Sequence, residues 1–241
     1  MDKDLIKYFS DFLTENRLRR FDEVIAHRTR HITIVLEDIF QPHNASAVLR
    51  TCDCFGIQDV HIIENNYRYS VNPDVELGSA KWITLHRYSR GLKGDGTEKI
   101  PSAYAGNQLA TSDCVTELKK KGYKIIVTSP HKNDCTIDEL DLTQKTALFF
   151  GSEKPGVSSS AFELADGFVK IPMVGFTESL NISVSAAVTL YTLTSRLKKE
   201  NVAWQLSEKE IAEIKLQWIK NSLPKTTNAE LLEKEFYKMK K

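Results

Sequence analysis

Long hydrophobic runs are missing from this sequence. No stretch approaches the ~20 consecutive apolar residues that a helix needs to span a bilayer. The first residues, Met1 to Asp4, lead into a polar, amphipathic segment that differs from the apolar core of a signal peptide. We therefore expect neither membrane insertion nor export, and we expect the chain to act in the cytoplasm.

Cysteine is scarce as well, with 4 residues in the whole chain. Their spacing is neither that of paired metal ligands nor that of a small disulfide-rich domain. The four are Cys52, Cys54, Cys114 and Cys135. We expect reduced thiols and no metal site.

An excess of one charge is the third feature that the sequence lacks. Lys and Arg number 33 against 32 Asp and Glu, a formal net charge of +1, which argues against a strongly basic nucleic-acid-binding protein. The distribution of charge therefore matters more than its total. With 41% hydrophobic and 27% charged residues, 241 residues suffice for one main globular domain with appended helices.

Basic side chains gather between Asn16 and His31, where Asp22 and Glu23 are the acidic residues. They are Arg17, Arg19, Arg20, Arg28 and Arg30, with His27 and His31. Two interpretations stay open. The segment is either a solvated helix face or an arm that contacts phosphates, which arginine binds in a bidentate manner.

The most informative stretch runs from Thr146 to Tyr191. Its apolar run 147–150 is bounded by turn-forming residues, which predicts a buried strand that leads into the glycine-rich segment 151–156. A second strand ends at Ile171, because Pro172 prevents its simple continuation. Open α/β sheets bind ligands at the carboxyl ends of their strands, so we expect a ligand site here.

A helix closes this stretch, and we expect its apolar residues to pack on the sheet. Those at helical spacing are Ile182, Val184, Ala187, Val188 and Tyr191. The small residues at the start of this helix also allow another backbone to approach closely.

A βαβ unit is predicted in the first third of the chain. It consists of a strand at 32–39, a helix that follows the break at Gln41-Pro42-His43 and ends at Gly56, and a strand at 60–63. On this helix, Arg50 lies off the apolar stripe and is expected to face outward or into a cleft. The apolar stripe consists of Ala45, Val48, Leu49, Cys52 and Phe55. Strands at 83–87 and 124–128 and a helix at 114–121 extend the pattern to a parallel α/β sheet with flanking helices.

Helical signals occupy both ends of the chain. Leu5, Phe9, Phe12 and Leu13 recur at helical spacing near the N-terminus. Ser207 to Glu210 form a capping box, and a last helix follows Asn228. We therefore expect a basic helical extension at 1–30, a core at 31–200 and a helical extension at 201–241.

The segment 89–113 has no clear period and is interpreted as an inserted loop. Its residues 91–96 superficially resemble a phosphate cradle, but they have neither Walker spacing nor the strand, GxGxxG and helix of a dinucleotide site. A nucleotide-binding oxidoreductase is therefore disfavoured. The role of the loop stays open, with Arg87, Arg90, Lys93 and Tyr104 as candidate RNA contacts.

Three short motifs occur in a fixed order along the chain. Asn44 and Arg50 stand six positions apart at the start of a helix, and Gly151-Ser152-Glu153 is followed by Gly156. The third motif combines Ile171-Pro172-Met173 with Ser179-Leu180-Asn181. Together they resemble the three motifs of the SpoU-type RNA 2′-O-ribose methyltransferases, closest to the TrmH branch, which modifies the tRNA D-loop guanosine. The resemblance covers roughly residues 17–199.

The resemblance implies an α/β fold with a C-terminal deep trefoil knot of the SPOUT type. It also implies S-adenosylmethionine as cofactor, held in the knot, a tRNA substrate and a homodimer. The implied catalytic residues are Arg50, Asn44, Glu153, Ser179 and Asn181. The implied cofactor-binding residues are Thr128, Gly151, Ile171 and Leu180, and the implied RNA-binding residues are Arg20, Arg28, His43 and Lys119.

Chemistry refines these roles. A guanidinium with a pKa above about 12 is rarely deprotonated, so we expect Arg50 to bind a phosphate, align the 2′-hydroxyl and stabilise the developing alkoxide. Asn44 and Asn181 orient these groups, cap a helix N-terminus, or do both. Glu153 supports the motif loops or shapes the charge near the sulfonium. The alternatives are the same chemistry on rRNA or another tRNA position, or a catalytically silent RNA-binding protein.

Overall fold

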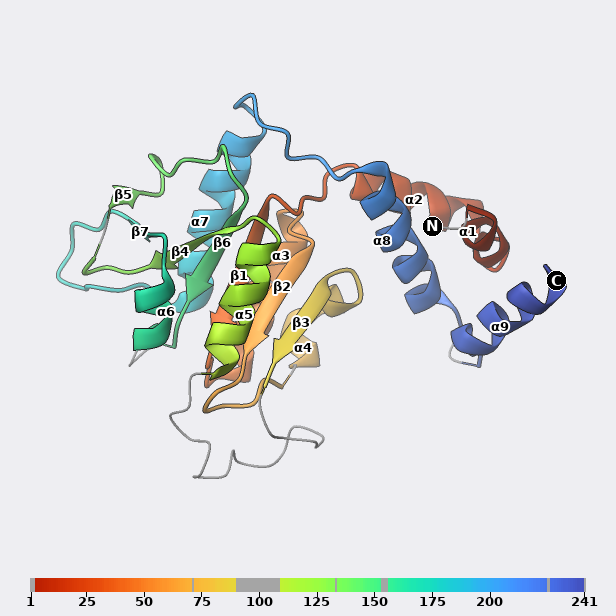
Figure 1. Cartoon of the computed structure of the whole chain (residues 1–241), viewed down its shortest axis with the longest axis horizontal. Coiled ribbons are helices and arrows are strands. Elements are labelled where there is room, and N and C mark those ends of the chain that lie inside the picture. The colour runs from red at the N-terminus through yellow and green to blue at the C-terminus, as the bar shows by residue number, and fades with distance from the viewer. Residues whose placement is uncertain are drawn as a thin grey trace. The chain divides into compact units, whose positions relative to one another are not determined.

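The chain forms two compact units, residues 29–204 and residues 1–28 with 205–241 (Figure 1). The structure is a computed structural model that describes residues 3–70, 72–89, 109–132, 134–152, 156–224 and 226–240. The larger unit holds the sheet. The smaller one is built from helices at both ends of the chain.

A parallel seven-stranded sheet organises the larger unit, with the order β3-β2-β1-β6-β4-β7-β5. The strands are β1 (Ile32–Glu37), β2 (Asp59–Ile63), β3 (Thr84–Tyr88), β4 (Lys124–Thr128), β5 (Cys135–Thr136), β6 (Thr146–Phe150) and β7 (Gly167–Lys170). The expected parallel α/β sheet is confirmed, with strand ends that shift by a few residues. Because every pair is parallel, the carboxyl ends of the strands share one edge.

Helices cover both faces of the sheet, with α5 and α6 in front and α3 and α7 behind in Figure 1. They are α3 (Pro42–Cys54), α5 (Leu109–Lys120), α6 (Ser159–Leu164) and α7 (Ile182–Leu197), with a short α4 (Pro73–Glu76) and a 3₁₀ turn (Ser79–Lys81). On β1, Ile34 faces the α3 and α7 core while Val35 faces the α5 and α6 core. Burial on both faces explains why the central strands are continuous apolar runs.

The apolar face expected for α7 is partly wrong. Ile182 is buried, but Val184, Val188 and Tyr191 keep 46%, 37% and 64% of their surface exposed. The residues that pack on the sheet are Ile182, Ala186, Thr189, Leu190, Leu193 and Leu197. This helix carries two apolar stripes at helical spacing, and the sequence pattern alone does not say which one faces the sheet.

The helices of the two chain ends pack on one another. They are α1 (Lys3–Ser10), α2 (Glu15–Ile25), α8 (Glu208–Ser222) and α9 (Ala229–Met239). Trp218 is 1% exposed and meets Phe21 edge to face, with ring centroids 5.6 Å apart. The predicted capping box is confirmed, because Ser207 and Glu210 exchange side-chain to backbone hydrogen bonds. The two terminal segments therefore share one apolar core.

Candidate active site

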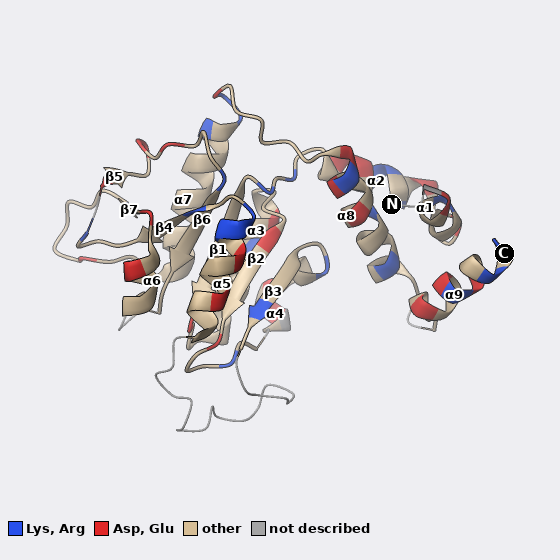
Figure 2. Ribbon diagram, in the orientation of Figure 1, with Lys and Arg blue, Asp and Glu red and all other residues tan. Residues whose placement is uncertain are grey.

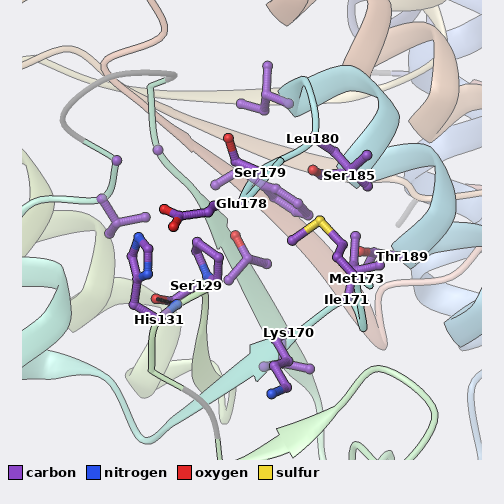
Figure 3. A pocket seen from close by; sticks show the side chains of 18 of the residues that line it. Ser129, His131, Lys170, Ile171, Met173, Glu178, Ser179, Leu180, Ser185 and Thr189 are labelled. Atoms are coloured by element: carbon purple, nitrogen blue, oxygen red, sulfur yellow. Dashed lines mark hydrogen bonds between the residues drawn. The ribbon is translucent and has the colours of Figure 1, made fainter. Parts of the chain in front are cut away.

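A cavity of about 500 Å³ opens at the carboxyl ends of β4, β6 and β7, beside α7 (Figure 3). Its walls come from residues 128–131, 150–152, 169–171 and 178–182, with further residues from α7, α6 and the segment before α6. Four segments that are distant in sequence thus meet at one edge. This is the edge at which a parallel α/β sheet binds ligands.

Most residues expected at the cofactor site line this cavity. All four residues that were expected to bind the cofactor line the cavity, and Ser179 and Asn181 line it as well. The four are Thr128, Gly151, Ile171 and Leu180. Figure 3 shows Ile171, Ser179 and Leu180 around the same space as Ser129, His131 and Glu178, which the sequence analysis did not single out. The glycine turn and the proline-ended strand therefore build one site.

The turn after β6 requires glycine at Gly151. A Cβ at that position would lie 2.1 Å from the backbone carbon of Gly156, far inside the closest real contacts. Gly156 has φ 70°, and its N–H donates to the carbonyl of Ser152 over 3.0 Å. Two backbone segments meet so closely here that a side chain has no room. Glu153 lies outside the described residues, so its catalytic role stays a prediction.

A buried carboxylate under the turn was missed by the sequence analysis. Glu37, 1% exposed at the end of β1, accepts hydrogen bonds from Ser158 N and Oγ, both over 2.8 Å, and from Thr111 Oγ1 over 2.5 Å. Ser158 in turn caps the N-terminus of α6. Glu37 therefore ties β1 to the chain that leaves the glycine turn. A single glutamate inside the apolar run 32–39 was the available signal.

Two buried hydroxyls in the cavity wall favour a polar ligand. Within the described part of the chain, neither Ser152 Oγ nor Thr189 Oγ1 has a hydrogen-bond partner, although their residues are only 7% and 0% exposed. Buried polar atoms normally find partners. The rest of the lining mixes apolar groups, such as Met173 and Leu180, with polar ones. The lining fits S-adenosylmethionine, whose flat adenine ring suits the apolar groups and whose ribose and methionine parts offer polar groups to the hydroxyls.

The first motif is linked to the cavity by a pair of asparagines. Asn44, 4% exposed, accepts a hydrogen bond on Oδ1 from Nδ2 of Asn181 over 3.3 Å. Asn181 also caps α7, because its Oδ1 accepts from the backbone N of Ser183 over 2.8 Å. The cap expected at Asn181 is confirmed. Asn44 is not a cap, since α3 begins two residues earlier at Pro42, which suits the first helical position.

Arg50 faces solvent, as its place off the apolar stripe predicted. His43 lies seven residues earlier on the same exposed face of α3, roughly 10 Å along the helix axis at 1.5 Å per residue. Neither residue lines the cavity. The structure thus brings Asn44 to the cavity side of the first motif and leaves Arg50 and His43 on its outer face.

The expected RNA-binding residues fall into different environments. Arg20 is exposed and pairs with Glu23 over 3.1 Å, and Lys119 is exposed and pairs with Asp166 over 2.8 Å. Arg28 is 2% exposed, with its guanidinium 5.2 Å from the ring centroid of Trp218. A guanidinium buried in this way packs against the other helices of the small unit, and the RNA-binding role of Arg28 stays a prediction.

Acidic and basic residues both occur along α2 and α8 in Figure 2. Of the arginines clustered in the sequence, Arg17, Arg19 and Arg20 lie on α2 together with acidic residues, while Arg28 and Arg30 follow the helix.

Across the described residues, no group of three or more His, Cys, Asp or Glu side chains is placed to hold a metal ion. No described helix is long and apolar enough to cross a membrane.

A cavity lies among the strand ends of a parallel α/β sheet, and the Asn44 to Asn181 hydrogen bond joins it to the helix that carries Arg50. This arrangement is that of a ligand-binding α/β protein. The chain belongs to the SpoU rRNA Methylase family, which it matches over residues 31–93 and 95–191.

Individual relatives extend this similarity over most of the chain. The tRNA (guanosine(18)-2′-O)-methyltransferase of Borreliella burgdorferi is 38% identical over 90% of this chain and 92% of its own. The solved A. aeolicus TrmH/SpoU tRNA modifying enzyme has a TM-score of 0.70 at 28% identity and covers 88% of this chain and 98% of its own. AviRb from Streptomyces viridochromogenes, solved in complex with AdoMet, shares the fold at 21% identity with a TM-score of 0.53, over 74% of this chain and 62% of its own.

Proposed function

We propose that the protein transfers a methyl group from S-adenosylmethionine to the ribose 2′-hydroxyl of a guanosine in the tRNA D-loop. The similarity to the Borreliella burgdorferi enzyme, which spans nearly the whole of both chains, carries this proposal. The site supports it, because the second and third motifs share one cavity and the Asn44 to Asn181 hydrogen bond joins the first motif to them. A tRNA substrate places the enzyme in the cytoplasm.

The cavity residues would hold the cofactor. Thr128, Gly151, Ile171 and Leu180 form its walls, and the hydroxyls of Ser152 and Thr189 offer hydrogen bonds to polar groups of the ligand. When bound, S-adenosylmethionine supplies an electrophilic methyl group on a sulfonium. The backbone of the glycine turn lets a ligand approach without a side chain between them.

Positioning is the main task of the remaining residues, since methyl transfer needs the hydroxyl oxygen in line with the methyl group. Arg50 acts as a cation, because guanidinium groups are not deprotonated in proteins. It binds a substrate phosphate, aligns the 2′-hydroxyl and stabilises the negative charge that develops on that oxygen. Asn44 and Asn181 orient the ribose from the cavity side. Glu153 supports the motif loops.

A homodimer and a C-terminal trefoil knot belong to the same proposal. Val184, Val188 and Tyr191 form an exposed apolar stripe on α7, and the Tyr191 ring lies 6.2 Å from that of Phe55. In the loop before α7, Val174 and Phe176 are fully exposed, at 105% and 109%. Apolar surface of this extent marks an interaction site. In a dimer with two-fold symmetry, this surface of each copy would cover the same surface of the other copy.

The test is transfer of labelled methyl from S-adenosylmethionine to unmodified tRNA and rRNA transcripts, with the Arg50→Ala variant alongside. We expect label in tRNA that is lost with Arg50→Ala, while binding of the cofactor persists. Label in rRNA alone would keep the chemistry and change the substrate. Binding of RNA without transfer of label would make the protein a silent RNA-binding module and refute the proposal.

A further inference from the structure

Two exposed aromatic side chains meet where β1 and β2 end. Phe40 follows β1 and Tyr67 follows β2, with ring centroids 5.0 Å apart and planes at 72°. Phe40 keeps 63% of its surface exposed and Tyr67 keeps 43%. The rings thus form an open corner in which one ring edge meets the face of the other, a favourable aromatic geometry.

Hydrogen bonds hold the two loops that carry these rings. Asp38 Oδ1 accepts from the backbone N of Asn65 over 2.8 Å and of Asn66 over 2.7 Å, and Oδ2 accepts from Asn66 Nδ2 over 2.7 Å. Asp38 has φ 51°, a left-handed conformation that residues other than glycine adopt rarely. Because Asp38 fixes one loop to the other, the backbone that carries the rings is held in place before a ligand arrives, which lowers the entropic cost of binding.

The aromatic pair lies at the carboxyl ends of the strands, as the cavity does. In the sheet, β1 lies between β2 and β6, and β6 ends at the cavity. Asn44, which bonds the cavity residue Asn181, comes four residues after Phe40. The exposed face of α3 that follows carries His43 and Arg50. The pair therefore stands beside the first motif, whose residues the proposed function assigns to the substrate ribose.

The chemistry of this surface selects one occupant. Two rings offer a base-sized area, far below the ~800 Å² per partner that a stable protein interface buries. The Arg50 guanidinium on the neighbouring helix attracts phosphates. Proteins that read RNA stack unpaired bases on exposed aromatic rings, and a loop of tRNA supplies unpaired bases.

We propose that Phe40 and Tyr67 form a stacking platform for an unpaired base of the RNA substrate, next to the nucleotide that is methylated. This inference rests on the proposed function for the identity of the RNA. It assigns to the pair a role in substrate binding that is separate from the cofactor cavity and from the catalytic motifs.

The test compares Phe40→Ala, Phe40→Leu and Phe40→Trp in the full-length protein, with unmodified tRNA as the probe. Loss of one stacked base weakens binding by about 5- to 150-fold, so we expect that loss for Phe40→Ala and a similar one for Phe40→Leu. Phe40→Trp retains binding, because it keeps an aromatic face. The change appears in KM for tRNA and in Kd, while kcat and cofactor affinity stay near those of the wild type.

A fluorescent base gives a direct readout. A tRNA with 2-aminopurine in the D-loop is quenched on binding to the wild type and to Phe40→Trp, because stacking quenches this base. It stays bright with Phe40→Leu at saturating protein. Circular dichroism and cofactor binding of each variant show that it is folded.

Each alternative outcome is distinct. Wild-type tRNA affinity in Phe40→Ala overturns the platform and leaves the proposed function intact. Dissociation of a dimer by Phe40→Ala, with Phe40→Leu restoring it, identifies a protein contact and also overturns the platform. Tight, Phe40-dependent tRNA binding without any methyl transfer supports the platform and refutes the proposed function. Absence of RNA binding by the wild type refutes both.

Discussion

The His61 imidazole is 1% exposed on β2 and stacks on His86, with ring centroids 4.5 Å apart. The Tyr88 hydroxyl donates to Glu117, so Nδ1 of His61 donates to the Tyr88 oxygen, over 3.0 Å. Burial, and then the neighbouring His86, lower the pKa of His61 from 6.5 to about 3. The imidazole therefore remains neutral in the folded protein at pH values where it is protonated in the unfolded chain.

This shift predicts a specific loss of stability in acid. Because the folded pKa is depressed, the stabilisation is complete above pH 6.5 and declines as the pH falls toward 3. At pH 4.5 the free energy of unfolding is lower by about 2 to 3 kcal/mol than at neutral pH on account of this residue. Urea unfolding of the wild type and His61→Gln at pH 7.5 and 4.5 measures it.

The variant should show a shallower pH dependence over that interval, even if it is less stable throughout. His131→Gln, which removes an exposed imidazole from the same unit, is the control for the loss of a histidine as such. If the free energy of unfolding changed equally between pH 7.5 and 4.5 in the wild type and in His61→Gln, the lowered pKa of His61 would be contradicted. Asp59, whose pKa is lowered by His86 and Arg30 against the effect of burial, loses its contribution only below pH 3.8.

Among single residues, those of the candidate site were predictable where a sequence motif contains them. Thr128, Gly151, Ile171 and Leu180 were expected together and line one cavity. Glu37 was not expected, because its role comes from Ser158 and Thr111, which lie 121 and 74 residues away in sequence. The burial of Arg28 against Trp218 depends on a contact between opposite ends of the chain, which a local count of charges does not contain.

At the scale of elements, the glycine turn 151–156 restricts most strongly which residue can stand at a position. Gly151→Ala places a methyl group against the backbone of Gly156, so the turn has to open. We expect cofactor affinity to fall by at least about tenfold, since about 1.4 kcal/mol of strain accounts for that factor. Far-ultraviolet circular dichroism should change little, because the central strands remain. Isothermal titration with S-adenosylmethionine measures the affinity.

Gly175→Ala is the matched control for this experiment. A Cβ at Gly175 has its nearest neighbour 4.0 Å away, so the change fits without movement. Cofactor affinity near that of the wild type in Gly151→Ala would show that the turn does not shape the cavity.

The helices and strands themselves were predictable from local sequence patterns wherever one or both faces of the element are apolar. The strand at 124–128 was expected with the bounds that the structure shows, because its apolar run lies between polar turns. The orientation of α7 was not predictable. Its stripes at Ile182, Ala186 and Leu190 and at Val184, Val188 and Tyr191 have the same period, and only the packed sheet distinguishes them.

At the scale of the whole molecule, the outer stripe of α7 predicts self-association. Val188→Glu puts a charge into the proposed interface, and an uncompensated buried charge is costly. We expect sedimentation velocity to show a dimer for the wild type and a monomer for Val188→Glu at the same concentration. Lys198→Glu, an exposed change at the end of the same helix, should remain dimeric. A monomeric wild type, or a dimeric Val188→Glu, would contradict this account.

The most direct test of the central claim is to locate the methyl group on a tRNA. A 2′-O-methyl group removes the hydroxyl that attacks the neighbouring phosphodiester, so the bond that follows the modified nucleotide resists alkali. Unmodified tRNA is incubated with S-adenosylmethionine and the wild type or Arg50→Ala, then hydrolysed and resolved by length. We predict one resistant bond, after a D-loop guanosine, that is missing with Arg50→Ala. A tRNA that is cleaved at every position after incubation with the wild type would contradict the proposed function.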